Sequence, residues 1–135
     1  MAATYHLKVI SAYGTFFDGE CIHTIIPCED GTRGILARHE DCIISIVPGP
    51  LRIKLPDETE LLAAVTAGYA AVDRGTLTLI VDTAERPEDI DENRAEEAIR
   101  QAGEELKHRQ SRIEYEQSQA TMARAMARLK VKRMS

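Results

Sequence analysis

The residue pattern of this chain changes at Ala84, and the change divides it into two unlike parts. Before Ala84, runs of β-branched residues are separated by turn residues. After it, Ala, Glu, Gln, Lys, Arg and Leu recur at helical spacing, with one glycine, Gly103, and one proline, Pro87, at a helix start. We therefore predict an α+β fold, in which an N-terminal antiparallel β-sandwich (residues 1–84) precedes a C-terminal antiparallel two-helix hairpin (residues 85–135).

Residues 1–84 contain short strand candidates at the turn spacing typical of an antiparallel sandwich or barrel. Thr4–Ala12 alternates, with Leu7 and Val9 on one face. Gly14 and Asp18-Gly19 then mark turns. The later strand candidates are Cys21–Pro27, Gly34–Leu36, Cys42–Val47, Leu51–Leu55, Leu61–Val72 and Thr76–Val81.

Residues 85–135 form two apolar stripes at helical spacing, with a break near 108–112. The first stripe is Ala95, Ala98, Ile99, Ala102 and Leu106. The second is Ala120, Ala123, Ala127 and Val131, with Met122, Met126 and Leu129 beside it. Because alanine buries little apolar area, the hairpin should be only marginally stable by itself, which suits a part that moves.

Charge is distributed unevenly along the chain. Residues 1–84 carry 6 Lys/Arg against 11 Asp/Glu, residues 85–105 carry 3 against 9, and residues 106–135 carry 8 against 2, so the balances are −5, −6 and +6. An acidic first helix and a basic second helix favour antiparallel pairing. The cationic end of the second helix is equally suited to an acidic partner; it comprises Arg124, Arg128, Lys130, Lys132 and Arg133.

Other features favour no metal, catalytic or membrane-spanning role. Cys21, Cys28 and Cys42 are odd in number, and strand alternation places Cys28 on the opposite face from Cys21 and His23, so buried reduced thiols are favoured over a zinc site. The sequence has no Gly-rich phosphate loop and no catalytic triad. No apolar run approaches the roughly 20 residues that cross a bilayer, and we expect a soluble cytosolic protein without nucleic-acid partners.

Four stretches together resemble one known family. They are Tyr5-His6-Leu7-Lys8-Val9-Ile10-Ser11; the segment 31–49 with Gly31, Gly34, His39, Cys42-Ile43-Ile44-Ser45-Ile46 and Pro48-Gly49; Ala67-Gly68-Tyr69 followed by residues 77–84; and Ile90-Asp91-x-x-Arg94-Ala95. In order and spacing, the chain resembles the epsilon subunit of the bacterial F-type ATP synthase along nearly its whole length. It departs from the family at Ala37-Arg38, where Pro-Gly is usual, and at Gln101, which is often arginine.

The resemblance implies a noncatalytic rotor subunit that couples ion-driven rotation to ATP synthesis. Its β domain would bind the gamma subunit and the membrane c ring, with Glu29, Asp30 and His39 at this rotor interface. The subunit would be peripheral, at the cytoplasmic face of the cell membrane. When extended, the two-helix tail would reach the beta subunits of the catalytic head and block ATP hydrolysis.

Helix geometry adds a nucleotide site to this expectation. In a hairpin bent near residue 110, position 94 lies opposite position 126, so Arg94, Arg124 and Arg128 can converge on phosphate. The resemblance adds Glu85, Ile90, Asp91 and Ala95 to the site and makes ATP a regulatory ligand, with no required cofactor. In the competing interpretation Arg94 pairs with Asp91 or Glu97, and the other two arginines lie on a solvated face.

Two other functions stay open at this point. One is a free-standing ATP-sensing module, which would bind nucleotide but neither gamma nor the c ring. The other is a small enzyme that uses the Cys and His residues, which would need a bound metal.

Overall fold

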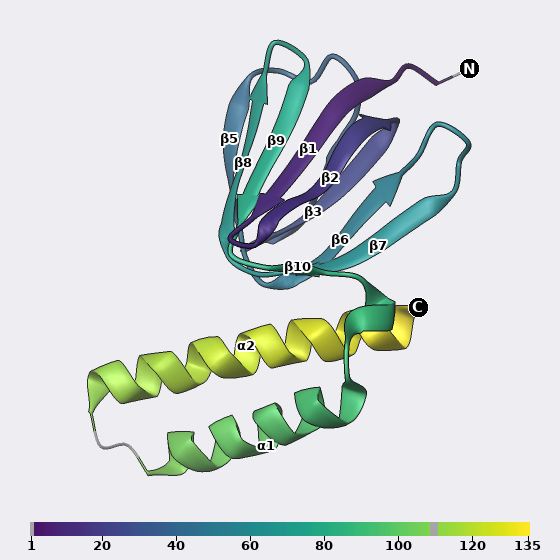
Figure 1. The fold of residues 1–135 in the computed structure, drawn as a ribbon. Coiled ribbons are helices and arrows are strands. Elements are labelled where there is room, and N and C mark those ends of the chain that lie inside the picture. The colour runs from purple at the N-terminus through teal and green to yellow at the C-terminus, as the bar shows by residue number, and fades with distance from the viewer. Residues whose placement is uncertain (1, 109–110) are drawn as a thin grey trace.

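The computed structural model describes residues 2–108 and 111–135. Within them, ten strands, one short 3₁₀ helix (η1) and two α-helices follow one another along the chain (Figure 1). The strands are β1 (Tyr5–Ser11), β2 (Gly14–Cys21), β3 (His23–Cys28), β4 (Gly31–Ile35), β5 (Cys42–Ile46), β6 (Gly49–Lys54), β7 (Glu60–Val65), β8 (Gly68–Asp73), β9 (Thr76–Val81) and β10 (Ala84–Glu85). The helices are η1 (Pro87–Asp89), α1 (Glu92–Lys107) and α2 (Arg112–Met134).

The strands form two five-stranded sheets that pack face to face. One has the order β2-β1-β9-β8-β5 and the other β10-β7-β6-β3-β4. Neighbouring strands are antiparallel, except that β1 and β9 run parallel with Leu7 opposite Leu77. The predicted α+β fold, a β-sandwich followed by two helices, is therefore confirmed.

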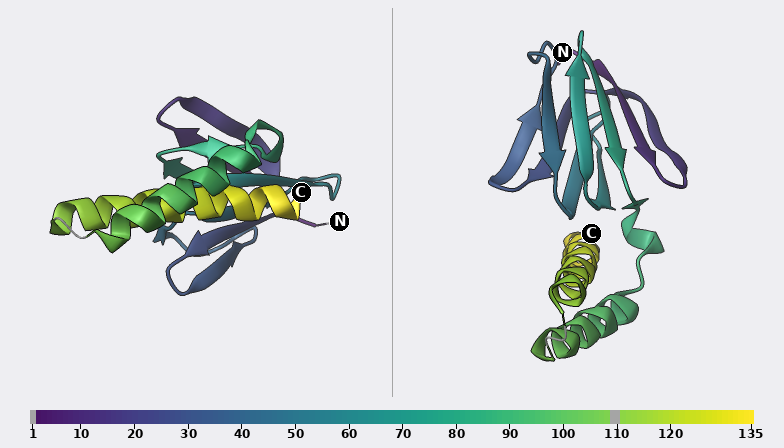
Figure 2. Two further views of the ribbon diagram at one scale, coloured as in Figure 1. Left: turned by 90° about the horizontal axis from the view of Figure 1, so that it is seen from below. Right: turned by 90° about the vertical axis from the view of Figure 1, so that its left-hand side faces the viewer.

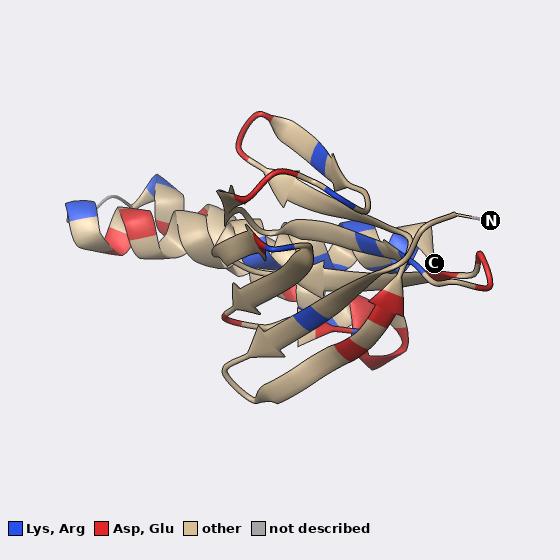
Figure 3. Ribbon diagram, turned by 90° about the horizontal axis from the view of Figure 1, so that it is seen from above, with Lys and Arg blue, Asp and Glu red and all other residues tan. Residues whose placement is uncertain are grey.

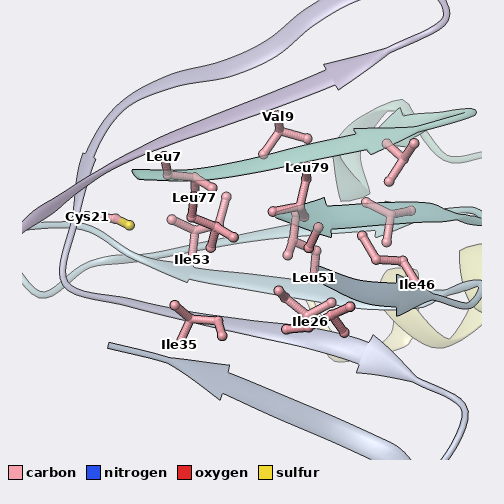
Figure 4. Packing of buried hydrophobic residues seen from close by; sticks show 14 of the residues in the cluster. Leu7, Val9, Cys21, Ile26, Ile35, Ile46, Leu51, Ile53, Leu77 and Leu79 are labelled. Atoms are coloured by element: carbon pink, nitrogen blue, oxygen red, sulfur yellow. The ribbon is translucent and has the colours of Figure 1, made fainter. Parts of the chain in front are cut away.

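The core lies between the two sheets and is made by the sandwich alone. Leu7, Val9 and Leu79 from one sheet meet Leu51 and Ile53 from the other, and all five side chains are fully buried (Figure 4). Among the described residues, the buried members of this cluster all fall between Tyr5 and Val81. The tail therefore contributes no buried side chain to the main core.

Two strand predictions were wrong. Asp18-Gly19 was expected to mark a turn, but it lies inside β2, an edge strand whose pairing with β1 absorbs an irregularity between Val9 and Ile10. Gly14, with φ 125°, does mark a turn as expected, since it closes the turn Ala12-Tyr13 between β1 and β2. The predicted strand Leu61–Val72 is instead two strands, β7 and β8, which belong to different sheets.

Hydrogen bonds between two threonines explain the division of β7 from β8. The chain crosses between the sheets at Thr66 and crosses back at Thr83. The Thr66 amide donates to the Thr83 carbonyl (3.1 Å), and the Thr83 amide donates to Thr66 Oγ1 (2.9 Å). The two crossings therefore satisfy each other's backbone groups, and the nearest glycine is Gly68, the first residue of β8.

The two helices of the tail run back alongside each other (Figures 1 and 2). The predicted break at 108–112 is confirmed at its borders, since α1 ends at Lys107 and α2 begins at Arg112; residues 109 and 110 lie outside the described residues. The first stripe is confirmed by the burial of Ala95 and Ala102.

The second stripe was wrong in part, because Ala120 and Ala123 are exposed. The buried residues of α2 are Ser118, Ala125, Ala127 and Val131. They serve two partners: Ser118 contacts Glu105 of α1, whereas Val131 packs with Ala64 of β7. A helix with two partners has no single apolar stripe, so the single-face assumption failed here.

The tail meets the sandwich through a small contact at one end of the β6–β7 pair. Val131, which is fully buried, packs with Ala64 and Ile90, and Leu62 lies beside them. α2 passes across this end of the sandwich, and α1 lies farther away (Figures 1 and 2). The linker that contains Ile90 is thus enclosed between the sandwich and the end of α2.

Candidate functional site

The segment that joins the sandwich to α1 is fixed by local hydrogen bonds and by one apolar side chain. Glu85 ends β10, where it pairs with Ala64, and Pro87 opens η1. Asp91 is the N-cap of α1, and its Oδ1 accepts a hydrogen bond from the Arg94 amide (3.1 Å). These contacts set the direction in which α1 leaves the sandwich.

The sequence Ile90-Asp91-x-x-Arg94-Ala95 has a structural explanation at three of its four named positions. Ile90 is buried against the sandwich, Asp91 caps the helix, and Ala95 is buried between the helices. Arg94 is the exception, because its charged side chain neither packs in an apolar contact nor caps the helix. The competing interpretation, that Arg94 pairs with Asp91, holds only for its backbone amide.

A cavity of about 310 Å³ lies where the linker, α1 and α2 meet. It is lined by Glu85, Asp89, Asp91, Arg94, Ala95, Ala98, Ala125 and Arg128. The three alanines let the helices approach closely and leave room beside them. The wall therefore combines two guanidinium groups with three carboxylates, which suits a ligand that has both an anionic part and hydrogen-bond donors.

The two arginines of this cavity differ in their partners. Arg128 is half-buried, and its Nε donates to Glu85 Oε1 at 2.7 Å. Arg94 is exposed, and within residues 2–108 and 111–135 its guanidinium has no hydrogen-bond or ion-pair partner. An incoming phosphate would thus find one arginine free and one held by a carboxylate.

The predicted convergence of three arginines is not what the structure shows. Arg124 lies outside the cavity wall, and its Nη2 donates to Thr121 of the same helix (3.2 Å). The predicted pairing of position 94 with position 126 fits the cavity, because the same antiparallel register places Ala125 beside Ala95. Of the three predicted arginines, Arg94 and Arg128 line the cavity and Arg124 does not.

Of the seven predicted nucleotide-site residues, five line the cavity and two do not. Those that line it are Glu85, Asp91, Arg94, Ala95 and Arg128, whereas Ile90 packs behind it and Arg124 lies outside. Asp89 also lines the cavity and is not among the residues predicted for it. Its place in a Pro-initiated turn just before the helix N-cap was the available signal.

A larger cavity, of about 590 Å³, lies between the helices farther from the sandwich. Its wall includes Glu104, Glu105, His108 and Glu114, and its described lining contains no arginine or lysine. It is therefore poorly suited to a phosphate, and the smaller cavity is the better candidate for a nucleotide.

Comparison with known proteins identifies the family. The beta-sandwich domain of the ATP synthase delta/epsilon chain matches residues 4–87, and the long alpha-helix domain of the same chain matches residues 88–133. The chain belongs to the ATP synthase delta/epsilon chain family. As a member of it, the chain is a noncatalytic subunit of the ATP synthase.

Relatives within the delta/epsilon chain family match over nearly their whole length. The ATP synthase epsilon chain of Ruminiclostridium cellulolyticum is 40% identical over 127 residues, which cover 94% of both chains. That of Herminiimonas arsenicoxydans is 40% identical over 130 residues, or 96% of this chain and 93% of the relative. The resemblance to the epsilon subunit that we drew from sequence motifs is thus confirmed.

Solved structures of ATP synthases share the fold. A chain in the Euglena gracilis mitochondrial ATP synthase, in a structure of OSCP, F1 and the c-ring, superposes with a TM-score of 0.83 at 18% identity, covering 94% of this chain and 80% of that one. A chain in the Tetrahymena thermophila central stalk and c-ring gives 0.54 at 17% identity, covering 62% and 67%. At these identities the likeness supports the fold.

The residues predicted for the rotor interface do not lie together. The exposed turn Glu29–Asp30 joins β3 to β4 and lies at the end of the sandwich that faces the helices. Just before this turn, the Pro27 carbonyl oxygen accepts a hydrogen bond from the Val47 amide, which shortly precedes β6. Gly49 at the start of β6 pairs with Val65, the neighbour of Ala64, which contacts the tail. β4 then runs the length of the sheet, so His39 lies at the opposite end, which Figure 3 views from outside.

His39 lies in the connection from β4 to β5 and is half-buried. Its Nδ1 is 2.8 Å from the Glu40 carbonyl oxygen and 3.8 Å from Cys42 Sγ. The preceding Arg38 has φ 64°, in the left-handed region that favours glycine. This conformation accounts for the glycine that the family usually has at this position.

The cysteines are dispersed over the sandwich. Cys21 is buried beside Thr24, whereas Cys28 and Cys42 are half-buried in strands β3 and β5. Within residues 2–108 and 111–135, no three His, Cys, Asp or Glu side chains are arranged to hold a metal ion. Neither described helix is long and apolar enough to cross a membrane.

Proposed function

We propose that this chain is a rotor subunit whose sandwich docks on the gamma subunit and the c ring and whose tail regulates ATP hydrolysis. In this proposal it works at the cytoplasmic face of the membrane. The folded tail permits hydrolysis, and the extended tail reaches the beta subunits of the catalytic head and blocks it. Family membership supports the place in the complex, and the attachment of the tail supports the regulatory part.

The observation that carries the regulatory proposal is the smallness of the contact between tail and sandwich. The main core contains no tail residue, and the apolar contact centres on Ala64, Ile90 and Val131. Full burial of one valine contributes ~1.5–3 kcal/mol, and alanine contributes less. The tail can therefore leave the sandwich without opening the core.

Truncation of the tail tests its regulatory role. The variant should end after Arg86, because β10 pairs with β7 and belongs to the sheet. We expect the reconstituted complex with this variant to assemble with gamma and to hydrolyse ATP faster than the complex with the full chain, most clearly at low ATP. Equal hydrolysis at both low and high ATP would refute a regulatory tail. Failure of the full chain to co-purify with gamma would favour a free-standing module instead.

We further propose that ATP binds in the 310 Å³ cavity and holds the tail folded. Arg94 and Arg128 would hold the phosphates, and the carboxylates of Glu85, Asp89 and Asp91 would accept from amino groups of the base. A ligand that binds only the folded form at about 100 times its dissociation constant adds ~2.7 kcal/mol of stability, which is large for so small a contact.

Calorimetric titration with ATP tests this site. Because a hydrogen bond between charged groups contributes about 1.5–3 kcal/mol, Arg94→Ala should weaken binding roughly 10- to 100-fold. Arg124→Ala removes the same charge from outside the cavity and should bind as the full chain does. Equal binding by wild type and Arg94→Ala would remove the site. Weaker binding by Arg124→Ala would instead support the originally predicted set of three arginines.

A further inference from the structure

Arg133, in the last turn of α2, makes its charged contacts with the first turns of α1. Arg133 Nε lies 3.2 Å from Glu92 Oε1, and Arg133 Nη2 lies 3.0 Å from Glu96 Oε1. The two glutamates are one turn apart on α1 and so present their carboxylates on the same face. One guanidinium therefore bridges two carboxylates of another helix, 41 and 37 residues away in sequence.

Neighbouring contacts keep Arg133 in this position. Val131 is fully buried against Ile90 and Ala64, and Lys132 Nζ donates to the Pro87 carbonyl at 3.0 Å. The three consecutive residues 131–133 thus touch the sandwich, the linker and α1. Removing the last turn of α2 would release all three at once.

Among the other described charged residues of the tail, no ion pair joins the two helices; Glu105 reaches α2 only by accepting a hydrogen bond from Ser118. Glu97 pairs with Arg100, and Glu104 pairs with Lys107, all within α1. Lys130 is exposed on α2, and within the described residues it has no ion-pair partner. Both signs of charge occur along the tail helices (Figure 3), but only some of them oppose separation of the helices.

We propose that Arg133, Glu92 and Glu96 form an electrostatic latch that holds the tail folded. The inference rests on the proposed movable tail and adds a control that is separate from the nucleotide, because none of the three residues lines the 310 Å³ cavity. All three side chains are partly exposed, so salt screens the latch. Ionic strength therefore shifts the tail toward its released form.

Hydrogen exchange of the backbone amides of residues 125–134 in the isolated full chain tests the latch. Two variants break it from opposite sides: Arg133→Gln, and Glu92→Gln with Glu96→Gln. At low salt each should exchange about three- to tenfold faster than wild type. At about 1 M salt, where the Debye length is about 3 Å, the difference should vanish.

Matched controls separate the latch from general changes of charge. Lys130→Gln removes one positive charge from the same turn of α2. Glu97→Gln with Glu104→Gln removes two negative charges from α1, from residues whose ion pairs lie within α1. Both should exchange at the wild-type rate. In addition, combining all three latch substitutions should add little to either variant alone, because they break the same contact.

The outcomes distinguish the latch from the proposed function. Wild-type exchange in both latch variants, or equally fast exchange in the controls, would overturn the latch. If the latch variants open the tail at low salt but leave ATP hydrolysis of the assembled enzyme unchanged, the latch stands and the inhibitory tail fails.

Discussion

At the scale of single residues, a buried tyrosine of β1 forms hydrogen bonds with both strands of the β3–β4 hairpin. The Tyr5 hydroxyl donates to the Ile35 carbonyl oxygen (2.9 Å) and lies 2.6 Å from Thr24 Oγ1. Burial raises the pKa of the Tyr5 phenol above its ordinary value. Because the group is buried and hydrogen-bonded in its neutral form, it stabilises the fold as long as it keeps its proton.

Tyr5→Phe should therefore lower the free energy of unfolding by about 1–2 kcal/mol at neutral pH, because the buried Ile35 carbonyl loses its donor and the Thr24 hydroxyl loses its acceptor. Urea denaturation measures this. Tyr13→Phe is the matched control, since Tyr13 is 89% exposed, and it should unfold as wild type does. A stable Tyr5→Phe variant would show that these hydrogen bonds contribute nothing net.

The raised pKa of Tyr5 also predicts a dependence on pH. An unfolded chain loses the phenol proton near pH 10, whereas the folded chain keeps it to higher pH. The unfolded state then binds fewer protons, so stability falls as pH rises above 10. Denaturation at about pH 8 and pH 11 should show a smaller loss for Tyr5→Phe than for wild type.

Single residues also show where sequence reasoning about the site succeeded and failed. The placement of Arg94, Arg128 and Glu85 around one cavity follows from helix periodicity and the family resemblance, whereas the ion pair between Arg128 and Glu85 was not predicted. The orientation of Arg124 does not follow from them, because its guanidinium donates to Thr121 of the same helix instead. Helix periodicity places a residue on a face of the helix but does not decide which local partner a long side chain takes.

At the scale of elements, α2 holds the tail in place through one end. Val131 is its single large side chain that is fully buried, and its partners Ala64 and Ile90 come from β7 and the linker. A charge at this position would have to be buried among apolar groups or the helix would have to leave. We expect the helix to leave, because the sandwich core does not depend on it.

Val131→Asp should therefore expose the tail to trypsin, with cleavage about 10-fold faster or more, since the lost valine burial amounts to ~1.5–3 kcal/mol. The urea midpoint of the sandwich should fall only slightly, because the main core contains no tail residue and only the outer face of β7 becomes exposed. Met126→Asp introduces the same charge at a 51% exposed site on α2 and should leave the tail protected. Equal cleavage of the two variants would contradict the assigned attachment.

Elements with regular alternation or periodicity could be predicted, and elements defined by tertiary pairing could not. β1 and β9 alternate clearly, and α1 has a single apolar stripe. Asp18-Gly19 in β2 looked like a turn, but pairing with β1 makes it part of a strand. The crossing at Thr66 is fixed by hydrogen bonds to Thr83, 17 residues away in sequence. Such features depend on contacts between residues distant in sequence.

At the scale of the whole molecule, the sandwich holds a complete core and the tail does not. The buried cluster from Tyr5 to Val81 draws on both sheets, whereas the buried tail side chains are mostly alanines. The boundary predicted at Ala84 stays a prediction until fragments are tested, and the pairing of β10 indicates that a fragment should include Glu85.

A fragment of residues 1–86 should accordingly fold alone and unfold cooperatively in urea, whereas a fragment of residues 87–135 should show no cooperative transition. Removing the tail exposes Leu62 and Ala64 on the outer face of β7, so the sandwich should lose only about 1–2 kcal/mol relative to the full chain. The tail lacks the apolar side chains that offset the entropy cost of its ordering, about 1.5 kcal/mol per residue.

A full chain with the Val131→Asp substitution provides the comparison, because it keeps the tail but releases it and should match fragment 1–86 in urea midpoint. An unfolded 1–86 fragment would show that the sandwich needs the tail. The tail would then be a structural clasp that cannot leave without unfolding the subunit, and regulation by its release would be ruled out on stability alone.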